Sequence, residues 1–369
     1  MTLSNKLIAQ LRSATRSLLR RPPAARGAMR EAIEPAAASP PAATGTTNNM
    51  HNHPPRRSAY DPFSSMLADL GRLGQLGANP FVFPAFGAAP SLPGHFIDAA
   101  YANDAGSRDY KLYVPSGHAG QPAPLLVMLH GCAQSADDFA IGTGMNALAE
   151  ECGCLVAYPA QSQHANASRC WNWFNAVDQQ HGQGEPSIIA GLTRDVMARY
   201  AVDPRRVYVA GLSAGGAMAA IMGTLYPELY AAVGVHSGLP FAAAHDLPSA
   251  FAAMKGEFQR RQASGRAVPI IVFHGDRDTT VHPANGDELM QRRRRHPLEA
   301  TVIEPGQVPD GHAYTRTVHR RPDGSIHAEH WLVHGSGHAW SGGDARGSYT
   351  DIKGPSASQE MMRFFRTAR

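Results

Sequence analysis

The sequence has few cysteines. Only four occur in 369 residues, namely Cys132, Cys152, Cys154 and Cys170. So few thiols at such irregular spacing exclude a scaffold held together by disulfides, and they exclude a zinc site with paired Cys-x-x-Cys ligands. We expect most of them to be buried thiols.

The sequence also lacks a long apolar run. No run reaches the roughly 20 residues that a membrane-spanning helix needs, which excludes a transmembrane segment. A secretory signal peptide is not expected either, because polar and basic residues interrupt the N-terminal leucines. The interrupting residues are Lys6, Gln10, Arg12, Arg16 and Arg20. We therefore expect a cytoplasmic location.

The sequence has few charged residues and a small net charge. Charged residues make up 17% of the chain, the net charge is +4 and the pI is near 8.9. Much of the excess comes from the arginine-rich N-terminus and from Arg292–Arg295, which we interpret as a solvated helix end. A nucleic-acid partner is not needed to explain this balance, and none is expected.

The chain is long enough to bury a large core, and 43% of its residues are hydrophobic. Residues 1–20 predict a basic amphipathic helix, because apolar residues recur at helical spacing over 3–19; it could contact its own domain, a membrane surface or a partner. Residues 21–95 read as a Pro-, Ala- and Gly-rich linker, largely disordered but partly docked through Phe81, Phe83 and Phe86. Residues 96–369 form the expected folded domain.

From Phe96 onward, short apolar runs alternate with helical stretches, the pattern of a mainly parallel sheet covered on both faces. The sequence thus predicts an α/β fold. Strands are expected at 125–129, 155–158, 207–210, 232–235, 270–273 and 331–333, with 110–114 at an antiparallel edge; helices are expected at 139–151, 188–200 and 215–226. The dipeptide Asp203-Pro204 predicts a turn before the third of these strands.

The strongest motif is Gly211-Leu212-Ser213-Ala214-Gly215, directly after a predicted strand and before a small-residue helix. A G-x-S-x-G in that setting predicts a nucleophile elbow, a strained turn that exposes the serine hydroxyl above the sheet. The start of the helix also offers backbone N–H groups to a developing oxyanion. We expect Ser213 to be a catalytic nucleophile.

A serine nucleophile needs a base and an acid that orients the base. Asp278 follows a predicted strand in His274-Gly-Asp-Arg-Asp278, at the edge where catalytic groups collect in such sheets; Asp276 is the alternative acid. His338 follows the last predicted strand in a glycine-flanked loop, downstream of the acid, and this position favours it over His334, His330 and His312. We expect Asp278 and His338 to complete a triad.

The loop after the first predicted parallel strand should supply the second oxyanion donor. We assign the amides of Cys132 and Ala214 to this site. Trp171, Trp173 and Trp340 flank the same machinery and predict a substrate-binding surface for an apolar or ring-bearing group, although burial in the core is the alternative. A Cys132–Cys170 disulfide joining these loops is a further hypothesis. No cofactor or metal site is expected. The cluster His327-Ala-Glu329-His330 is not interpreted as a metal site, because its residues alternate as in a strand.

Five ordered motifs together resemble the poly(3-hydroxybutyrate) depolymerase-type esterases, a family related to feruloyl and acetylxylan esterases. They are Leu129-His-Gly-Cys132, Cys170-Trp-Asn-Trp-Phe174, Gly211-Leu-Ser-Ala-Gly-Gly-Ala217, His274-Gly-Asp-Arg-Asp278 and Gly337-His-Ala-Trp340. The resemblance covers roughly residues 96–369. It implies an α/β-hydrolase fold, ester hydrolysis without a cofactor, Ser213, Asp278 and His338 as the triad, and Cys132 at the oxyanion position. It also adds an extracellular location as an alternative, as for many members.

Three functions are compatible with these residues. The first is a serine esterase for short-chain esters, with 3-hydroxybutyrate oligomers or polyhydroxyalkanoate-type polyester as substrate; soluble oligomers are favoured because no polymer-binding module is recognised after His338. The second is a feruloyl or acetylxylan-type carbohydrate esterase. The third is a non-catalytic binding protein of hydrolase fold.

Overall fold

A computed structural model describes residues 92–257, 268–292 and 300–367 of the chain. The chain divides into two units, residues 1–58 and 59–369, and all of the described residues belong to the second. The helix predicted over residues 3–19 and nearly all of the predicted linker, with its three phenylalanines, lie outside the described residues. No helix within the described ranges is long and apolar enough to span a membrane.

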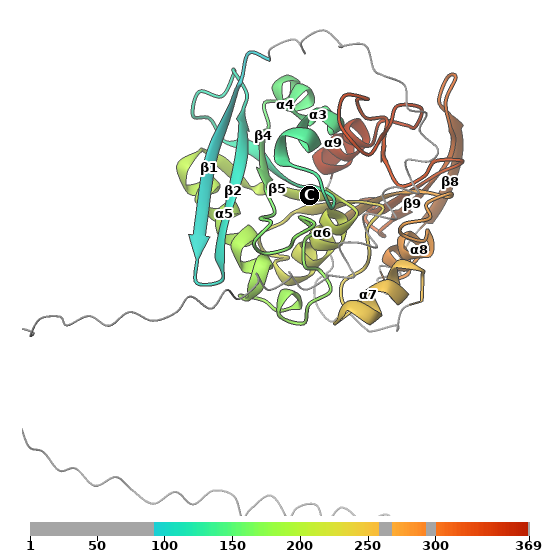
Figure 1. Cartoon of the computed structure of the whole chain (residues 1–369). Coiled ribbons are helices and arrows are strands. Elements are labelled where there is room, and N and C mark those ends of the chain that lie inside the picture. Colours follow the sequence, from blue (N-terminus) through green and yellow to red (C-terminus); the bar gives the residue numbers. More distant parts are fainter. Residues whose placement is uncertain (1–91, 258–267, 293–299, 368–369) are drawn as a thin grey trace, which may run out of the picture. The chain divides into compact units, whose positions relative to one another are not determined.

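The described part of the chain is built on a ten-stranded sheet (Figure 1). Its strands follow the order β1-β2-β4-β3-β5-β6-β7-β10-β9-β8. Their bounds are β1 (His95–Asn103), β2 (Gly106–Val114), β3 (Ala123–Leu129), β4 (Leu155–Pro159), β5 (Val202–Leu212), β6 (Ala232–His236), β7 (Ile270–Gly275), β8 (Ala300–Gln307), β9 (Ala313–Arg320) and β10 (Ile326–Val333). A second, small sheet pairs β11 (Trp340–Ser341) with β12 (Thr350–Asp351).

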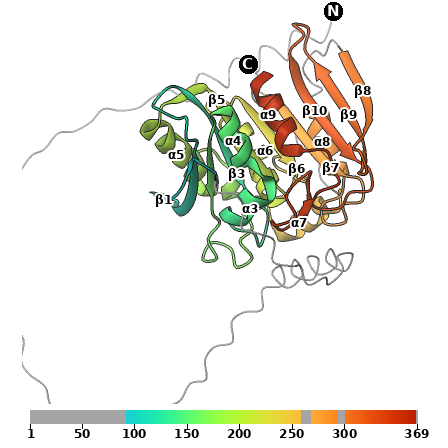
Figure 2. The same ribbon diagram turned by 90° about the horizontal axis from the view of Figure 1, so that it is seen from above.

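Six neighbouring strands, from β4 to β10 in the sheet order, run parallel. Antiparallel pairs extend this block on both sides: β2 and β1 beyond β4, and β9 and β8 beyond β10. Seen from above, the β8–β10 wing and β1 lie at opposite ends of the sheet (Figure 2). Because the six central strands are parallel, the loops after their carboxyl ends all emerge at one edge, where sites form in such folds.

Helices cover both faces of the sheet, as predicted. They are α3 (Ala136–Thr143), α4 (Met145–Cys152), α5 (Gly184–Arg199), α6 (Ala214–Leu225), α7 (Leu247–Met254), α8 (Ala284–Gln291) and α9 (Ala357–Thr367), with a 3-10 turn η1 (Val177–Gln179). Along β3, Leu125, Val127 and Leu129 pack into one core with α5 and α6, whereas Leu126 and Met128 pack into a second core with α3, α4 and α9. This alternation is the two-residue period of a strand buried on both faces. The predicted α/β class is confirmed.

Three local predictions need correction. The strand predicted at 110–114 lies in β2, which is antiparallel as expected, but β1 and not β2 forms the edge of the sheet. The dipeptide Asp203-Pro204 lies inside β5, where the pairing with β3 is irregular, and not in a turn before it. The single helix predicted at 139–151 is two helices, because Gly144 adopts a left-handed conformation (φ +61°) that ends α3.

Candidate active site

Ser213 lies in the tight turn between β5 and α6. Its φ of +58° and ψ of −119° are a strained conformation for a residue with a side chain. The Ser213 amide donates a hydrogen bond to the backbone oxygen of His236 at the end of β6 (2.9 Å). Glycine is required at position 215, because a Cβ there would overlap the backbone of Leu129 and His130. The turn therefore has the geometry of a nucleophile elbow.

Asp278 and His338 come from loops that follow β7 and β10, two paired parallel strands. Oδ2 of Asp278 lies 2.7 Å from Nδ1 of His338. The carboxylate is fully buried, whereas the imidazole side chain is 12% exposed. The buried acid thus holds one ring nitrogen and leaves the other, Nε2, for proton transfer, which is the division of roles in a Ser-His-Asp site.

The Asp278 carboxylate is fixed on both oxygens. Oδ1 accepts hydrogen bonds from the amides of Thr280 (2.9 Å) and Val281 (2.8 Å). Behind Oδ2, Nε2 of His274 lies 3.5 Å away and also 2.8 Å from the Val281 oxygen. Burial alone would raise the pKa of Asp278, but His338 and His274 outweigh it and hold this pKa well below its usual range. The carboxylate therefore stays charged and can stabilise an imidazolium.

Asp276, the alternative acid, has other partners. Its Oδ2 lies 3.0 Å from Nδ1 of His334, and its Oδ1 accepts a hydrogen bond from the Gly335 amide (2.7 Å). These contacts fasten the loop after β7 to the loop after β10. The geometry favours Asp278 as the partner of His338 and gives Asp276 a structural contact.

The Ser213 hydroxyl makes no hydrogen bond within the described residues, so its contact with His338 stays a prediction. The loops of these two residues are nevertheless tied to one residue, His236. Its backbone oxygen binds the Ser213 amide, and its Nε2 accepts a hydrogen bond from the Ser341 amide (3.0 Å), three residues after His338.

Of the two proposed oxyanion donors, Cys132 lies in the loop after β3 and Ala214 is the first residue of α6. The two segments meet where Gly215 lies against the backbone of Leu129 and His130. Neither the Cys132 amide nor the Ala214 amide donates a hydrogen bond to a backbone oxygen within the described ranges, and their role as oxyanion donors stays a prediction. A disulfide joins Cys132 to Cys170 (Cα–Cα distance 4.2 Å), as the sequence hypothesis suggested. It links the loop after β3 to the loop after β4, which carries Trp171 and Trp173.

The buried side chain of His130 stabilises the loop after β3, which contains Cys132. Its Nδ1 lies 2.7 Å from the Gly131 oxygen, and its Nε2 accepts from the Gln161 amide (3.0 Å). Burial lowers the pKa of His130 to about 4, so the ring is neutral and can accept this bond. The Gly131 amide in turn donates to Oε1 of Gln134 (2.9 Å). These bonds fix the backbone on the N-terminal side of Cys132.

Comparison with known proteins places this architecture in a family. The family described as "Esterase PHB depolymerase" matches residues 108–302, more than half of the chain. The chain belongs to this esterase family. It is 33% identical over 240 residues to a poly(3-hydroxyalkanoate) depolymerase C of Paucimonas lemoignei, covering 61% of this chain and 57% of the relative. It is 31% identical over 199 residues to a feruloyl esterase B of Neurospora crassa, covering 49% and 67%.

A solved structure of an acetyl xylan esterase from Aspergillus awamori matches the fold. The TM-score is 0.56 at 21% identity, with 71% of this chain and 94% of that chain covered. The expected resemblance to the depolymerase-type esterases and the α/β-hydrolase fold are therefore confirmed. The match spans little more than half of the Paucimonas depolymerase, so the activity of that whole protein is not transferred directly.

In this member of the esterase family, the three tryptophans near the site are buried. Trp171 donates from Nε1 to the His130 oxygen (3.2 Å), and Trp340 donates to Oγ of Ser358 (3.0 Å). Trp173 is 4% exposed, and the other two are 1% exposed or less. In this conformation their rings pack the loops that carry the site, so direct stacking of a substrate ring, the sequence-based interpretation, is not favoured.

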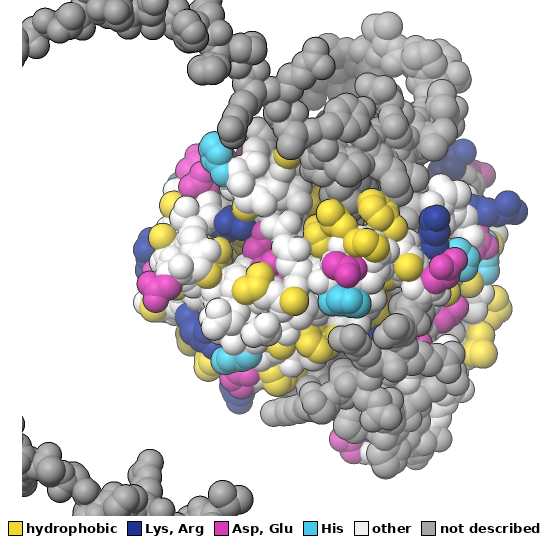
Figure 3. All heavy atoms as spheres, turned by 60° about the horizontal axis from the view of Figure 1, so that its bottom comes forward, with side chains coloured by type: hydrophobic (Ala, Val, Ile, Leu, Met, Phe, Trp, Pro, Cys, Tyr) yellow, Lys and Arg dark blue, Asp and Glu magenta, His cyan; other side chains and the backbone are white. Residues whose placement is uncertain are grey.

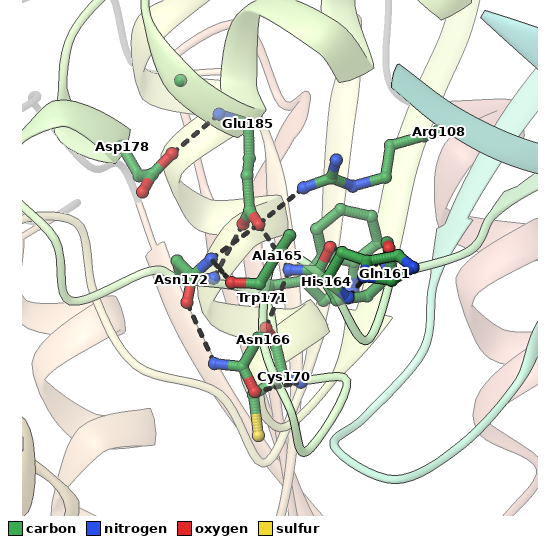
Figure 4. Close-up of polar contacts among 12 residues, drawn as sticks. Arg108, Gln161, His164, Ala165, Asn166, Cys170, Trp171, Asn172, Asp178 and Glu185 are labelled. Atoms are coloured by element: carbon green, nitrogen blue, oxygen red, sulfur yellow. Dashed lines mark hydrogen bonds and ion pairs between the residues drawn. The ribbon is translucent and has the colours of Figure 1, made fainter. Parts of the chain in front are cut away.

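A buried carboxylate, that of Glu185, binds the loop that carries Trp171 and Trp173 (Figure 4). Glu185, in the first turn of α5, accepts hydrogen bonds from Arg108 (2.9 Å), from the Asn172 amide (2.7 Å) and side chain (2.9 Å), and from Gln161. Asn172 lies between Trp171 and Trp173, and its own Oδ1 accepts from Asn166 (3.0 Å). Sequence reasoning missed Glu185, because a lone glutamate at a helix start normally marks a solvated cap.

Sequence reasoning also missed His236 and the contact of His274 with Asp278. Both could have been suspected from one signal, because each is a histidine at the carboxyl end of a fully buried strand.

As for metals, the described parts of the chain contain no group of three or more His, Cys, Asp or Glu side chains that could hold an ion.

Proposed function

We propose that the protein is a serine esterase that hydrolyses short-chain carboxylic esters, with 3-hydroxybutyrate oligomers or polyhydroxyalkanoate-type polyester as its substrate class. The observation that carries this proposal is the 2.7 Å contact between Asp278 and His338, on loops tied through His236 to the strained turn of Ser213. Membership of the esterase family supports the same chemistry.

The reaction follows from the groups present. His338 takes the proton of the Ser213 hydroxyl through Nε2 as the oxygen attacks the ester carbonyl, and charged Asp278 stabilises the resulting imidazolium. The amides of Cys132 and Ala214 donate to the oxyanion of the tetrahedral intermediate. The imidazolium then protonates the leaving alcohol, and a water activated by His338 hydrolyses the acyl-enzyme.

A second substrate class is favoured by the similarity to relatives named feruloyl esterase and acetylxylan esterase. Such an enzyme would use the same triad on ferulate or acetate esters of polysaccharides. The burial of Trp171 and Trp340 gives a ferulate ring no exposed indole to stack on, and this favours the short-chain substrate.

The disulfide bears on location. Disulfides persist in oxidising compartments and are rare in the cytosol. The Cys132–Cys170 bond therefore supports an extracytoplasmic site of action, the alternative to the cytoplasmic location expected from the N-terminal sequence.

The test is a steady-state panel with p-nitrophenyl butyrate, 3-hydroxybutyrate oligomers, methyl ferulate and acetylated xylan. The proposal predicts the highest kcat/KM on the first two, and a loss of several orders of magnitude in kcat in Ser213→Ala. Ser107→Ala, a change at an exposed serine on β2, is the matched control and should leave all rates unchanged. A Ser213→Ala variant with near-full activity would disprove the mechanism, and a preference for methyl ferulate or xylan would select the second substrate class.

A further inference from the structure

His236 is a buried residue at the sheet edge where the carboxyl ends of the parallel strands meet, and it has no role in the proton transfers above. It ends β6, between β5 and β7 in the sheet, and is 1% exposed. Its ring stacks between two aromatic rings, with centroid distances of 5.1 Å to Trp340 and 5.8 Å to Phe273. Apolar packing alone could explain an aromatic residue here, but it does not explain an imidazole.

The polar contacts of His236 reach both halves of the site. The backbone oxygen holds the Ser213 amide (2.9 Å), and Nε2 lies 3.0 Å from the Ser341 amide. Because an amide can only donate, Nε2 must be the unprotonated nitrogen. The ring proton therefore sits on Nδ1, which lies 3.2 Å from Oγ of Ser237.

The surroundings keep this ring neutral. Burial lowers the pKa of His236 to about 3, the neighbouring His274 and His338 act in the same direction, and Asp278 opposes them. A bare acceptor at Nε2 is thus maintained throughout the pH range in which His338 would act as a base.

The loop that carries His338 has a second anchor on its far side. Trp340 donates from its indole nitrogen to Oγ of Ser358, which itself donates to the backbone oxygen of Thr143. His236 bonds both this loop and the Ser213 turn, and so links them directly. Without its acceptor, the Ser341 amide would be left buried and unpaired, at a cost that favours movement of the loop.

We propose that His236 is a positioning residue for ester hydrolysis: by bonding Ser213 through its backbone and Ser341 through Nε2, it sets the distance between the Ser213 hydroxyl and the imidazole of His338. This rests on the function proposed above. The residue touches neither the substrate nor the reacting atoms, so its removal acts on kcat through geometry, and a displacement of about 1 Å can cost 100-fold in rate.

Two substitutions separate the effect of the Nε2 hydrogen-bond acceptor from the effect of ring stacking. His236→Phe keeps an aromatic ring between Trp340 and Phe273 but removes the acceptor. His236→Gln loses the stacking but places an amide oxygen close to the position of Nε2. The matched control is His319→Phe on β9, a buried histidine far from that sheet edge, whose Nδ1 lies 2.9 Å from Oγ1 of Thr301.

With p-nitrophenyl butyrate we expect kcat to fall 10- to 100-fold in His236→Phe with KM within about twofold of wild type, and the rate of fluorophosphonate inactivation to fall in parallel. His236→Gln should recover most of kcat, although it packs less well, and His319→Phe should keep wild-type kcat. A folded His236→Phe variant with kcat within twofold of wild type would overturn the proposal, as would a His236→Gln variant as impaired as His236→Phe.

A measurement on the wild-type protein covers the case in which these variants do not fold. In the nitrogen NMR spectrum of histidine-labelled protein, the signals assigned to His236 should show the unprotonated shift at Nε2 and the protonated shift at Nδ1 at every pH of activity, the same pattern that is expected for His130. A protonated Nε2 on His236 would refute the inference. Failure of the proposed function looks different, because the wild-type protein itself would then neither hydrolyse esters nor react with the fluorophosphonate.

Discussion

Hydrogen-bond partners distinguish the two carboxylates of the loop after β7, although they are only two residues apart. Asp278 is fully buried, accepts from two amides and contacts His338. Asp276 is one-third exposed and contacts His334 and Gly335. Which aspartate can serve as the acid therefore depends on the direction in which its side chain points from the loop.

The two aspartates give a matched pair of variants. Asp278→Asn removes the charge that stabilises the imidazolium and orients His338, so kcat should fall by about 10³- to 10⁴-fold. Asp276→Asn should stay within about threefold of wild type. Steady-state kinetics on p-nitrophenyl butyrate decides between them, and a larger loss in Asp276→Asn would exchange their assignments.

At this scale the sequence could nominate Ser213, Asp278 and His338, because G-x-S-x-G, G-x-x-D and the glycine-flanked histidine are local patterns with defined backbone requirements; their catalytic roles stay predictions. The contact partners of Glu185 and His236 could not be predicted. The contact of His236 with Ser341 spans 105 positions, and the contact of Glu185 with Arg108 spans 77. Neither partner can be read from the neighbouring sequence, although the place of His236 at the end of a buried strand can.

At the scale of elements, the central strands and part of β2 were predictable, whereas β1, β8 and β9 were not. The strands from β3 to β7 show apolar runs because both of their faces are buried. β8 is exposed at nearly every position and β1 at most, so neither presents an apolar run or a clear alternation. The irregular pairing that keeps Asp203-Pro204 within β5 likewise depends on β3 and not on local sequence.

The disulfide between the loops after β3 and β4 yields a prediction at this scale. It closes a loop across 38 positions, so replacing both cysteines (Cys132→Ala with Cys170→Ala) should reduce the free energy of unfolding by about 2–4 kcal/mol. We also expect kcat to fall about tenfold, because the Cys132 amide loses its fixed place. Denaturant unfolding and kinetics measure the two effects.

The control for this prediction is Cys152→Ala, which removes an exposed free thiol and should change neither quantity. An equal loss of stability in Cys152→Ala, or an unchanged stability in the double variant, would show that the bond contributes nothing to the fold.

At the scale of the whole molecule, the sheet brings the loops after β3, β5, β6, β7 and β10 to one edge, and all proposed functional residues lie in those loops or at those strand ends. Among the coloured side chains on the face shown in Figure 3, basic ones lie next to acidic and apolar ones.

Buried histidines should make the stability of the protein depend on pH. Burial lowers the pKa of His330 to about 3, whereas the unfolded chain takes up this proton near pH 6.5. Between pH 6.5 and 4 the unfolded state therefore binds more protons than the folded state, so stability falls as the pH falls. His130 and His236 act in the same direction.

Urea unfolding at several pH values tests this dependence. His330→Phe should lose less stability than wild type between pH 6.5 and 4, by about 3 kcal/mol. Phe139→Leu, a buried apolar change in the core, should lower stability equally at every pH because it adds and removes no titrating group. An unchanged pH dependence in His330→Phe would mean that this ring is protonated in the folded state.

The central claim is that Ser213 is an activated nucleophile. Its most direct test is to react the native protein with a fluorophosphonate and to locate the adduct by mass spectrometry of the peptides. We predict a single adduct, on Ser213, with no labelling of Ser213→Ala and strongly slowed labelling of His338→Ala. A native protein that is not labelled, or that carries the adduct on another serine, would contradict the account.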